Sequence, residues 1–200
     1  MLPFALRRAL PRSARSGARS SFVGLAGLVV SVGLAAAGLL GCGDVKRPDG
    51  GQGLLAPGQT APDVVAEDPA GKEVRLEANR GKPFVVFFYP ADGTPGCTKE
   101  ACAFRDVWDR FAAAGVVVVG VSSNSRESHR KFQAEHKLPM ALASDESGAL
   151  GRAYGVSKKI WGYDRVSFLV DRGGKVAKVW PSVDPALHAS EVLAEAARLR

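Results

Sequence analysis

Two cysteines stand five residues apart in a stretch whose composition suits thiol chemistry. Cys97 and Cys102 lie within residues 87–105, which read FFYPADGTPGCTKEACAFR. An apolar run ends at Tyr89-Pro90, a loop rich in Gly, Pro and Thr follows, and Cys97 stands where a helix is expected to begin. The unpaired N–H groups and positive potential of a helix N-terminus favour a thiolate over a thiol. A buried structural cysteine is the common alternative, but this position favours a reactive one.

The spacing of the two cysteines restricts how they can react with each other. On an unbroken helix, residues five apart differ by about 500° of rotation and roughly 7.5 Å of rise, which puts their Cα atoms about 8–9 Å apart. A disulfide requires Cα atoms within about 7 Å. If Cys97 and Cys102 pair, the first helical turns must unwind. We therefore predict a segment that is helical when reduced and locally unfolded when oxidised. The alternative for Cys102 is a small core residue beside Phe104.

Strand and helix patterns alternate around this stretch, so we expect an α/β domain. Residues 83–89 (PFVVFFY) and 115–121 (GVVVVGV) are continuous apolar runs, typical of strands buried on both faces. The turn residues DRGG at 171–174 predict a hairpin, which would add antiparallel strands and make the sheet mixed. Other strands are expected within 64–76 and at 139–143, 167–170 and 175–179, and helices at 98–114, 125–137, 146–154 and 185–199.

The pattern Pro90-x3-Thr94-x2-Cys97 resembles the active-site motif of the peroxiredoxin family. The fuller TPGCTKEAC resembles that of the bacterioferritin comigratory protein, or peroxiredoxin Q-like, branch. The similarity extends from about Leu54 to the C-terminal helix. It implies a thioredoxin-like α/β fold, in which helices flank a mixed central β-sheet. It also implies a thiol peroxidase that uses no metal, haem or flavin cofactor.

The resemblance assigns a role to each position of the motif. Cys97 would attack the peroxide as a thiolate and become a sulfenic acid, which Cys102 would resolve as an intramolecular disulfide. Thr94 would hydrogen-bond the incoming peroxide, and Pro90 would shield the sulfenic acid from water.

A distant arginine completes the site that the resemblance implies. Arg165 would stabilise the thiolate and orient the peroxide, because a guanidinium keeps its charge. Glu100 would support the network around Thr94 and Arg165. The family often has Arg-x-Thr-Phe where this chain has Arg-Val-Ser-Phe from Arg165, and Ser167 keeps the hydroxyl. Without the motif, a surface charge at the start of a strand would be the better interpretation of Arg165.

The resemblance implies an antioxidant enzyme, a thioredoxin-dependent hydroperoxide reductase that acts on hydrogen peroxide and organic hydroperoxides. A thioredoxin-like dithiol would recycle it, and the branch suggests a monomer. The main alternative is an extracytoplasmic thiol–disulfide relay protein, because such proteins share this kind of fold. Those proteins usually carry C-x2-C, or C-x3-C with a distant histidine, whereas this chain has C-x4-C.

The N-terminal residues have the composition of an export signal. Residues 1–20 carry five arginines and no acidic residue, and residues 21–40 carry no charge. The apolar run then meets Leu39-Leu40-Gly41-Cys42, which resembles the bacterial lipobox, where a signal peptidase cuts before a cysteine that becomes acylated. The expected organisation is a lipoprotein-type signal peptide at 1–41, an acylated Cys42 and flexible tether at 42–53, and the peroxiredoxin domain at 54–200.

An uncleaved membrane helix is the alternative interpretation, because about 20 apolar residues can span a bilayer. Arginines stay on the cytoplasmic side in either case, so we expect a membrane-anchored domain on the periplasmic face. The pair Arg7-Arg8 matches a twin-arginine export signal only in part, which leaves the export route open.

The net charge of +7 does not indicate a nucleic-acid partner. Beyond residue 41, the chain holds 22 of its 27 basic residues against all 20 acidic ones, without a basic stripe. His129, His136 and His188 lack metal-ligand spacing, so we expect surface or capping histidines. Residues 161–163 (Trp-Gly-Tyr) precede Arg165 in a loop and either line a substrate entrance or cover the core; we expect the core.

Overall fold

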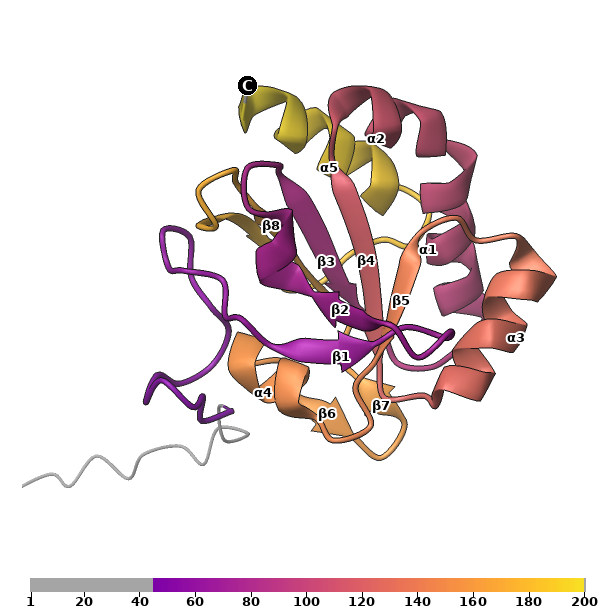
Figure 1. Cartoon of the computed structure of the whole chain (residues 1–200), viewed down its shortest axis with the longest axis horizontal. Coiled ribbons are helices and arrows are strands. Elements are labelled where there is room, and N and C mark those ends of the chain that lie inside the picture. The colour runs from indigo at the N-terminus through magenta and orange to yellow at the C-terminus, as the bar shows by residue number, and fades with distance from the viewer. Residues whose placement is uncertain (1–44, 200) are drawn as a thin grey trace, which may run out of the picture. The chain divides into compact units, whose positions relative to one another are not determined.

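The computed structural model describes residues 45–199, and their centre is a mixed seven-stranded sheet (Figure 1). Its strand order is β2-β1-β5-β4-β3-β8-β9, and a separate two-stranded sheet pairs β6 with β7. The strands are β1 (Val65–Glu67), β2 (Glu73–Arg75), β3 (Phe84–Phe88), β4 (Val117–Ser122), β5 (Ala141–Ser144), β6 (Lys158–Lys159), β7 (Gly162–Tyr163), β8 (Val166–Val170) and β9 (Val176–Trp180).

The central strand β3 fixes where the predicted site residues come together. All five of its residues are buried, as the continuous apolar run predicts. It pairs in parallel with β4 and antiparallel with β8, and Phe88 lies opposite Val166 in this register. The start of β8 therefore lies beside the end of β3. This pairing brings Arg165 next to the loop that leads to Cys97, and it confirms the predicted mixed sheet.

Two hydrophobic layers cover the sheet because alternate side chains of β3 point to opposite faces. Val86 and Phe88 pack in one layer, together with Tyr154. Phe87 and Tyr89 pack in the other, where Phe104 stacks on Phe87. The helices of the described chain are α1 (Pro95–Asp106), α2 (Trp108–Ala114), α3 (Arg126–His136), α4 (Ala149–Tyr154) and α5 (His188–Ala196), with 3-10 turns η1 (Leu76–Asn79) and η2 (Ala197–Leu199).

The helix expected at 98–114 is two helices, α1 and α2. They are separated at Val107, whose φ of −115° and ψ of 21° are not helical. The apolar periodicity continues across this break, so the sequence pattern did not reveal it. Helix α1 also begins earlier than expected, at Pro95, because proline fits the first helical turn. Helix α4 begins at residue 149 rather than 146, and α5 covers only the middle of the expected 185–199.

Residues 45–53 are folded against the domain, which differs from the flexible tether expected at 42–53. Arg47 is 6% exposed and donates from Nη1 to the carbonyl oxygens of Gly53 at 2.9 Å and Leu54 at 3.1 Å. The backbones of Gly155 and Gly53 are in contact. A Cβ at position 155 would lie 1.8 Å from the carbonyl oxygen of Gly53, so only glycine fits there. The rest of the tether, Cys42 and the expected signal at 1–41 lie outside the described residues. Within residues 45–199, no helix is both long enough and apolar enough to cross a bilayer.

Candidate active site

The predicted catalytic loop connects β3 to α1 and presents Cys97 in the first helical turn. Pro95 and Gly96 begin the helix, and Thr94 is its N-cap with extended backbone angles. The Thr94 hydroxyl makes no capping bond and instead donates to the carbonyl oxygen of Ala91 at 3.0 Å. Since its proton is directed to Ala91, the Thr94 oxygen can still accept a hydrogen bond. This exposed hydroxyl is therefore available to a substrate O–H group.

Cys97 is buried beneath the guanidinium of Arg165. Its exposed fraction is 1%, and Arg165 donates from Nη2 to the Cys97 sulfur at 3.3 Å. A Cβ on Gly96 would lie 3.2 Å from the same nitrogen, so the absence of a side chain lets Arg165 lie close over the first turn. A positive charge in contact with the sulfur stabilises a thiolate.

Glu100, which lies one helical turn after Cys97 on α1, holds Arg165 in place. Its carboxylate accepts a hydrogen bond from Arg165 Nη1. Burial raises the pKa of Glu100 to about 7, although Arg165 opposes that rise. Burial disfavours the charge of Arg165, but Glu100 and Cys97 outweigh this effect and raise its pKa. The second carboxylate oxygen of Glu100 is buried and has no hydrogen-bond partner within residues 45–199.

Two histidines are buried, so the expectation of surface or capping positions was wrong for them. His188 and His129 are both 0% exposed, whereas His136 is partly exposed. His188 Nε2 lies 2.8 Å from the hydroxyl of Ser167 in β8, the strand that follows directly after Arg165. Burial lowers the pKa of His188 to about 4, and the charge of Arg165 contributes. Helical periodicity alone could not show which helix face meets the sheet.

The Asp92 cluster, formed by Tyr89, Asp92, Ser128 and His129, fixes the first half of the catalytic loop, and the sequence analysis missed it. The Asp92 carboxylate accepts from Tyr89 at 2.8 Å and from Ser128 at 2.7 Å, and it lies 2.9 Å from His129 Nδ1. Burial would raise the pKa of Asp92, but these hydrogen bonds, above all that of His129, lower it. Its backbone N–H donates to Asn124 at 3.1 Å.

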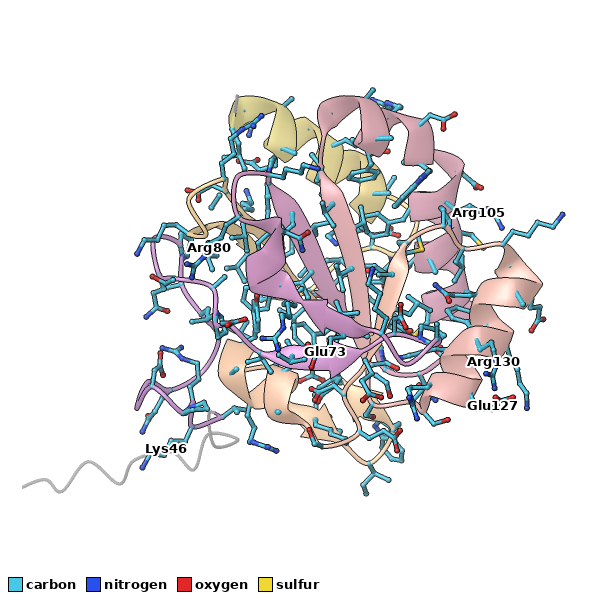
Figure 2. All side chains as sticks on the ribbon, in the orientation of Figure 1. Lys46, Glu73, Arg80, Arg105, Glu127 and Arg130 are labelled. Atoms are coloured by element: carbon cyan, nitrogen blue, oxygen red, sulfur yellow. The ribbon has the colours of Figure 1, made fainter. Side chains whose placement is uncertain are left out.

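Cys102 lies further along α1 and is partly buried. Both described cysteines are free thiols on one continuous helix, which is the helical arrangement predicted for the reduced state. Arg105, labelled in Figure 2, reaches from α1 to the end of α3 and donates to the carbonyl oxygen of His136 at 2.8 Å. Within residues 45–199, no three His, Cys, Asp or Glu side chains gather closely enough to hold a metal ion.

Residues 161–163 divide between the core and the surface. Tyr163 is buried and donates to Asp145 at 2.6 Å, as expected of a core residue. Trp161 is 74% exposed, so the expectation that it covers the core was wrong. Gly162 has a φ of +113°, and a Cβ added to it would lie 1.8 Å from the carbonyl oxygen of Pro90. The β6–β7 hairpin, which the sequence analysis also missed, therefore packs directly on the catalytic loop.

Comparison with known proteins identifies the family. A family model described as AhpC/TSA matches residues 57–179. The chain belongs to the AhpC/TSA family. A peroxiredoxin Bcp from Bacillus subtilis is 41% identical over 143 residues, which cover 68% of this chain and 91% of that protein. A putative peroxiredoxin bcp from Coxiella burnetii is also 41% identical, over 95% of its length and 68% of this chain.

Solved structures agree with this assignment. The crystal structure of peroxidoxin BcpB from Mycobacterium tuberculosis has a TM-score of 0.70 and 34% identity, covering 73% of this chain and 99% of the other. Peroxiredoxin Q from Xanthomonas campestris has a TM-score of 0.66 and 35% identity, and the match covers 72% of this chain and 96% of the other. The expected thioredoxin-like fold is confirmed. The chain is a peroxiredoxin, an enzyme with thiol-dependent peroxidase activity.

Proposed function

We propose that Cys97 reduces hydrogen peroxide and organic hydroperoxides, and that Cys102 resolves the product. The contact between the Arg165 guanidinium and the Cys97 sulfur, at the start of a helix, is the observation that carries this proposal. A bacterioferritin comigratory protein from Xanthomonas campestris, 34% identical, is described with alkyl peroxide reduction activity. The same chemistry fits this site.

The first step oxidises Cys97. The thiolate attacks one peroxide oxygen, the O–O bond breaks, and the other oxygen leaves with a proton as water or an alcohol. Arg165 stabilises the thiolate and the developing charge on the leaving oxygen. Thr94 accepts a hydrogen bond from the peroxide and aligns it for attack. Pro90 covers the resulting sulfenic acid.

The second step joins the two cysteines. The thiolate of Cys102 attacks the sulfenic sulfur, an S–S bond forms, and the sulfenic oxygen leaves as water after protonation. Helix geometry keeps the two Cα atoms beyond disulfide reach, so the N-terminal turns of α1 must unwind first. An external thioredoxin-like dithiol then reduces the disulfide and becomes oxidised itself. We expect the enzyme to work as a monomer.

A single-turnover experiment tests both cysteine roles. The reduced wild type should consume one equivalent of peroxide and lose the thiols of Cys97 and Cys102, as followed by mass spectrometry. Cys97→Ser should be inert, and Cys102→Ser should stop at a sulfenic acid that dimedone traps. Peroxide consumption by Cys97→Ser at the wild-type rate would overturn the proposal. Disulfide exchange with protein substrates and little peroxide consumption would favour the thiol–disulfide relay.

We also propose that an acylated Cys42 anchors the enzyme on the periplasmic face of a membrane. The proposal is supported by the uncharged run at 21–40, which leads directly into Gly41-Cys42. Mass spectrometry of the membrane fraction should find a lipid-modified Cys42 at the N-terminus, and Cys42→Ser should leave an uncleaved precursor. A mature chain that starts at another residue, without lipid, would contradict this proposal.

A further inference from the structure

The turn of the β6–β7 hairpin exposes two large apolar side chains. Ile160 is 93% exposed and Trp161 is 74% exposed, next to the exposed Lys158 and Lys159. Lys159 pairs with Asp164 at 2.6 Å, and Lys158 lies 5.9 Å from the ring centroid of Tyr163. Apolar side chains are usually withdrawn from water, so a tryptophan and an isoleucine projecting together from a turn indicate a binding surface.

The described chain begins beside this hairpin. Val45 and Lys159 line the same cavity of about 450 Å³, together with Gly53 and Gly155. In Figure 1 the indigo start of the described chain and the β6–β7 hairpin both lie along the lower edge of the domain. Lys46, labelled in Figure 2, marks this start. The chain therefore leaves the domain toward its N-terminus on the side that carries Ile160 and Trp161.

The chain between the proposed anchor and the domain is short. Cys42 precedes Val45 by three residues, and three residues span at most about 11 Å when fully extended. Residues 45–53 cannot lengthen this connection, because the buried Arg47 folds the segment on itself by bonding the Gly53 carbonyl, and Gly53 packs against the backbone of Gly155. The uncleaved apolar segment that ends at Leu40 would leave a connection only slightly longer. Either form of anchoring keeps the hairpin side of the domain close to the bilayer.

We propose that the β6–β7 turn docks on the lipid surface in which the N-terminus is anchored. This inference rests on the proposed membrane attachment. Tryptophan partitions to the level of the lipid headgroups, where its apolar ring and its N–H group are both accommodated. Isoleucine adds apolar contact, and the neighbouring lysines attract anionic headgroups.

Docking would turn the active site toward the membrane. Gly162, next to Trp161, touches the backbone of Pro90, whose loop leads to Cys97. A hairpin held in the headgroup region therefore keeps the catalytic loop at the lipid surface. Peroxides carried on phospholipid chains would reach Cys97 from that surface, whereas hydrogen peroxide would still arrive from water.

Fluorescence quenching tests the docking directly. The full chain is reconstituted into phosphatidylethanolamine and phosphatidylglycerol vesicles, with or without brominated acyl chains, which quench nearby tryptophans. Wild type should be quenched, and Trp161→Phe should lose that quenching. Trp108→Phe serves as the matched control, since Trp108 is a partly buried residue of α2, and it should keep the quenching. Equal quenching of Trp161→Phe and wild type, or no quenching of a vesicle-bound wild type, would overturn the docking.

Flotation and kinetics separate this inference from the proposals that it rests on. A chain that fails to float with the vesicles overturns anchoring and docking together, whereas a floating, unquenched chain overturns docking alone. Replacing Ile160 and Trp161 by serine should slow turnover of phospholipid hydroperoxide in the same vesicles several-fold and leave hydrogen peroxide turnover unchanged. The variant could instead react with both peroxides at the wild-type rate when reduced beforehand, but be reduced more slowly by a dithiol protein. That result would show that the hairpin binds the reductant and not lipid.

Discussion

Two polar clusters flank Cys97, one around Asp92 in the loop before α1 and one around Glu100 on α1, and their carboxylates differ in how completely they are hydrogen-bonded. The Asp92 carboxylate has three side-chain partners: Tyr89 directly after β3, and Ser128 and His129 of α3. Among the described residues, the Glu100 carboxylate has only Arg165 as a partner, and its other oxygen is buried without one. An unsatisfied buried oxygen lowers the cost of leaving the folded arrangement. The structure thus anchors the residues before Thr94 more firmly than the helical turns that carry the cysteines.

This difference suits an enzyme whose α1 must unwind to form the proposed disulfide. The break at Val107 separates α1 from α2, so unwinding of α1 need not propagate into α2. The following changes test the two clusters, beginning with the largest expected effect.

Arg165→Lys should reduce the second-order rate of peroxide reduction by about 100-fold, because lysine cannot bond the Cys97 sulfur and Glu100 together in the same planar geometry. Stopped-flow measurement of sulfenic acid formation reports this rate. Thermal unfolding should change little, since lysine keeps the charge beside Glu100. A rate within a factor of about two of the wild type would show that the guanidinium is not part of the reacting arrangement.

Asp92→Asn should act mainly on stability. The amide cannot accept from Tyr89, Ser128 and His129 together, so the free energy of unfolding should fall by about 3 kcal/mol in chemical denaturation. Peroxide reduction should slow by about tenfold because the loop loses its fixed position. Ser128→Ala removes one of the three donors and should cost about 1 kcal/mol. If Asp92→Asn proved as stable as the wild type, the cluster would not anchor the loop.

Glu100→Gln should remove a pH dependence of stability. The pKa of Glu100 rises from 4.5 to about 7 on folding, so the folded state binds more protons between these values. The wild type should therefore lose stability as the pH rises through this window, by up to about 3 kcal/mol relative to the glutamine variant. Denaturant titrations at several pH values measure the difference. Parallel pH profiles for the two proteins would contradict the burial effect on Glu100.

Thr94→Val should have the smallest effect on stability, because the Thr94 hydroxyl makes no capping bond to α1. The free energy of unfolding should change by less than about 0.5 kcal/mol, below the usual cost of losing an N-cap. Peroxide reduction should slow by about tenfold through the loss of one substrate hydrogen bond, and Thr94→Ser should restore it. Failure of the serine variant to recover would indicate a role for the methyl group instead.

Local patterns in the sequence were sufficient for the central strands and for the reactive end of α1. The runs at 83–89 and 115–121 are apolar throughout and became β3 and β4, because a strand buried on both faces tolerates little else. Proline, glycine and threonine before Cys97 similarly marked a loop that enters a helix. The role of Arg165 came from the family resemblance, since no local pattern connects residues 68 positions apart.

Only the tertiary structure decided which distant groups meet. The register of β3 against β8 places Arg165 over Cys97, and the packing of α3 and α5 on the sheet buries His129 and His188. The Asp92 cluster, the folded residues 45–53 and the exposed turn at Ile160 and Trp161 depend on such packing as well. The sequence by itself determined the local chemistry, because propensity and periodicity act between neighbours. The burial and pairing of polar groups depend on contacts between elements far apart in the chain, which only the folded sheet brings together.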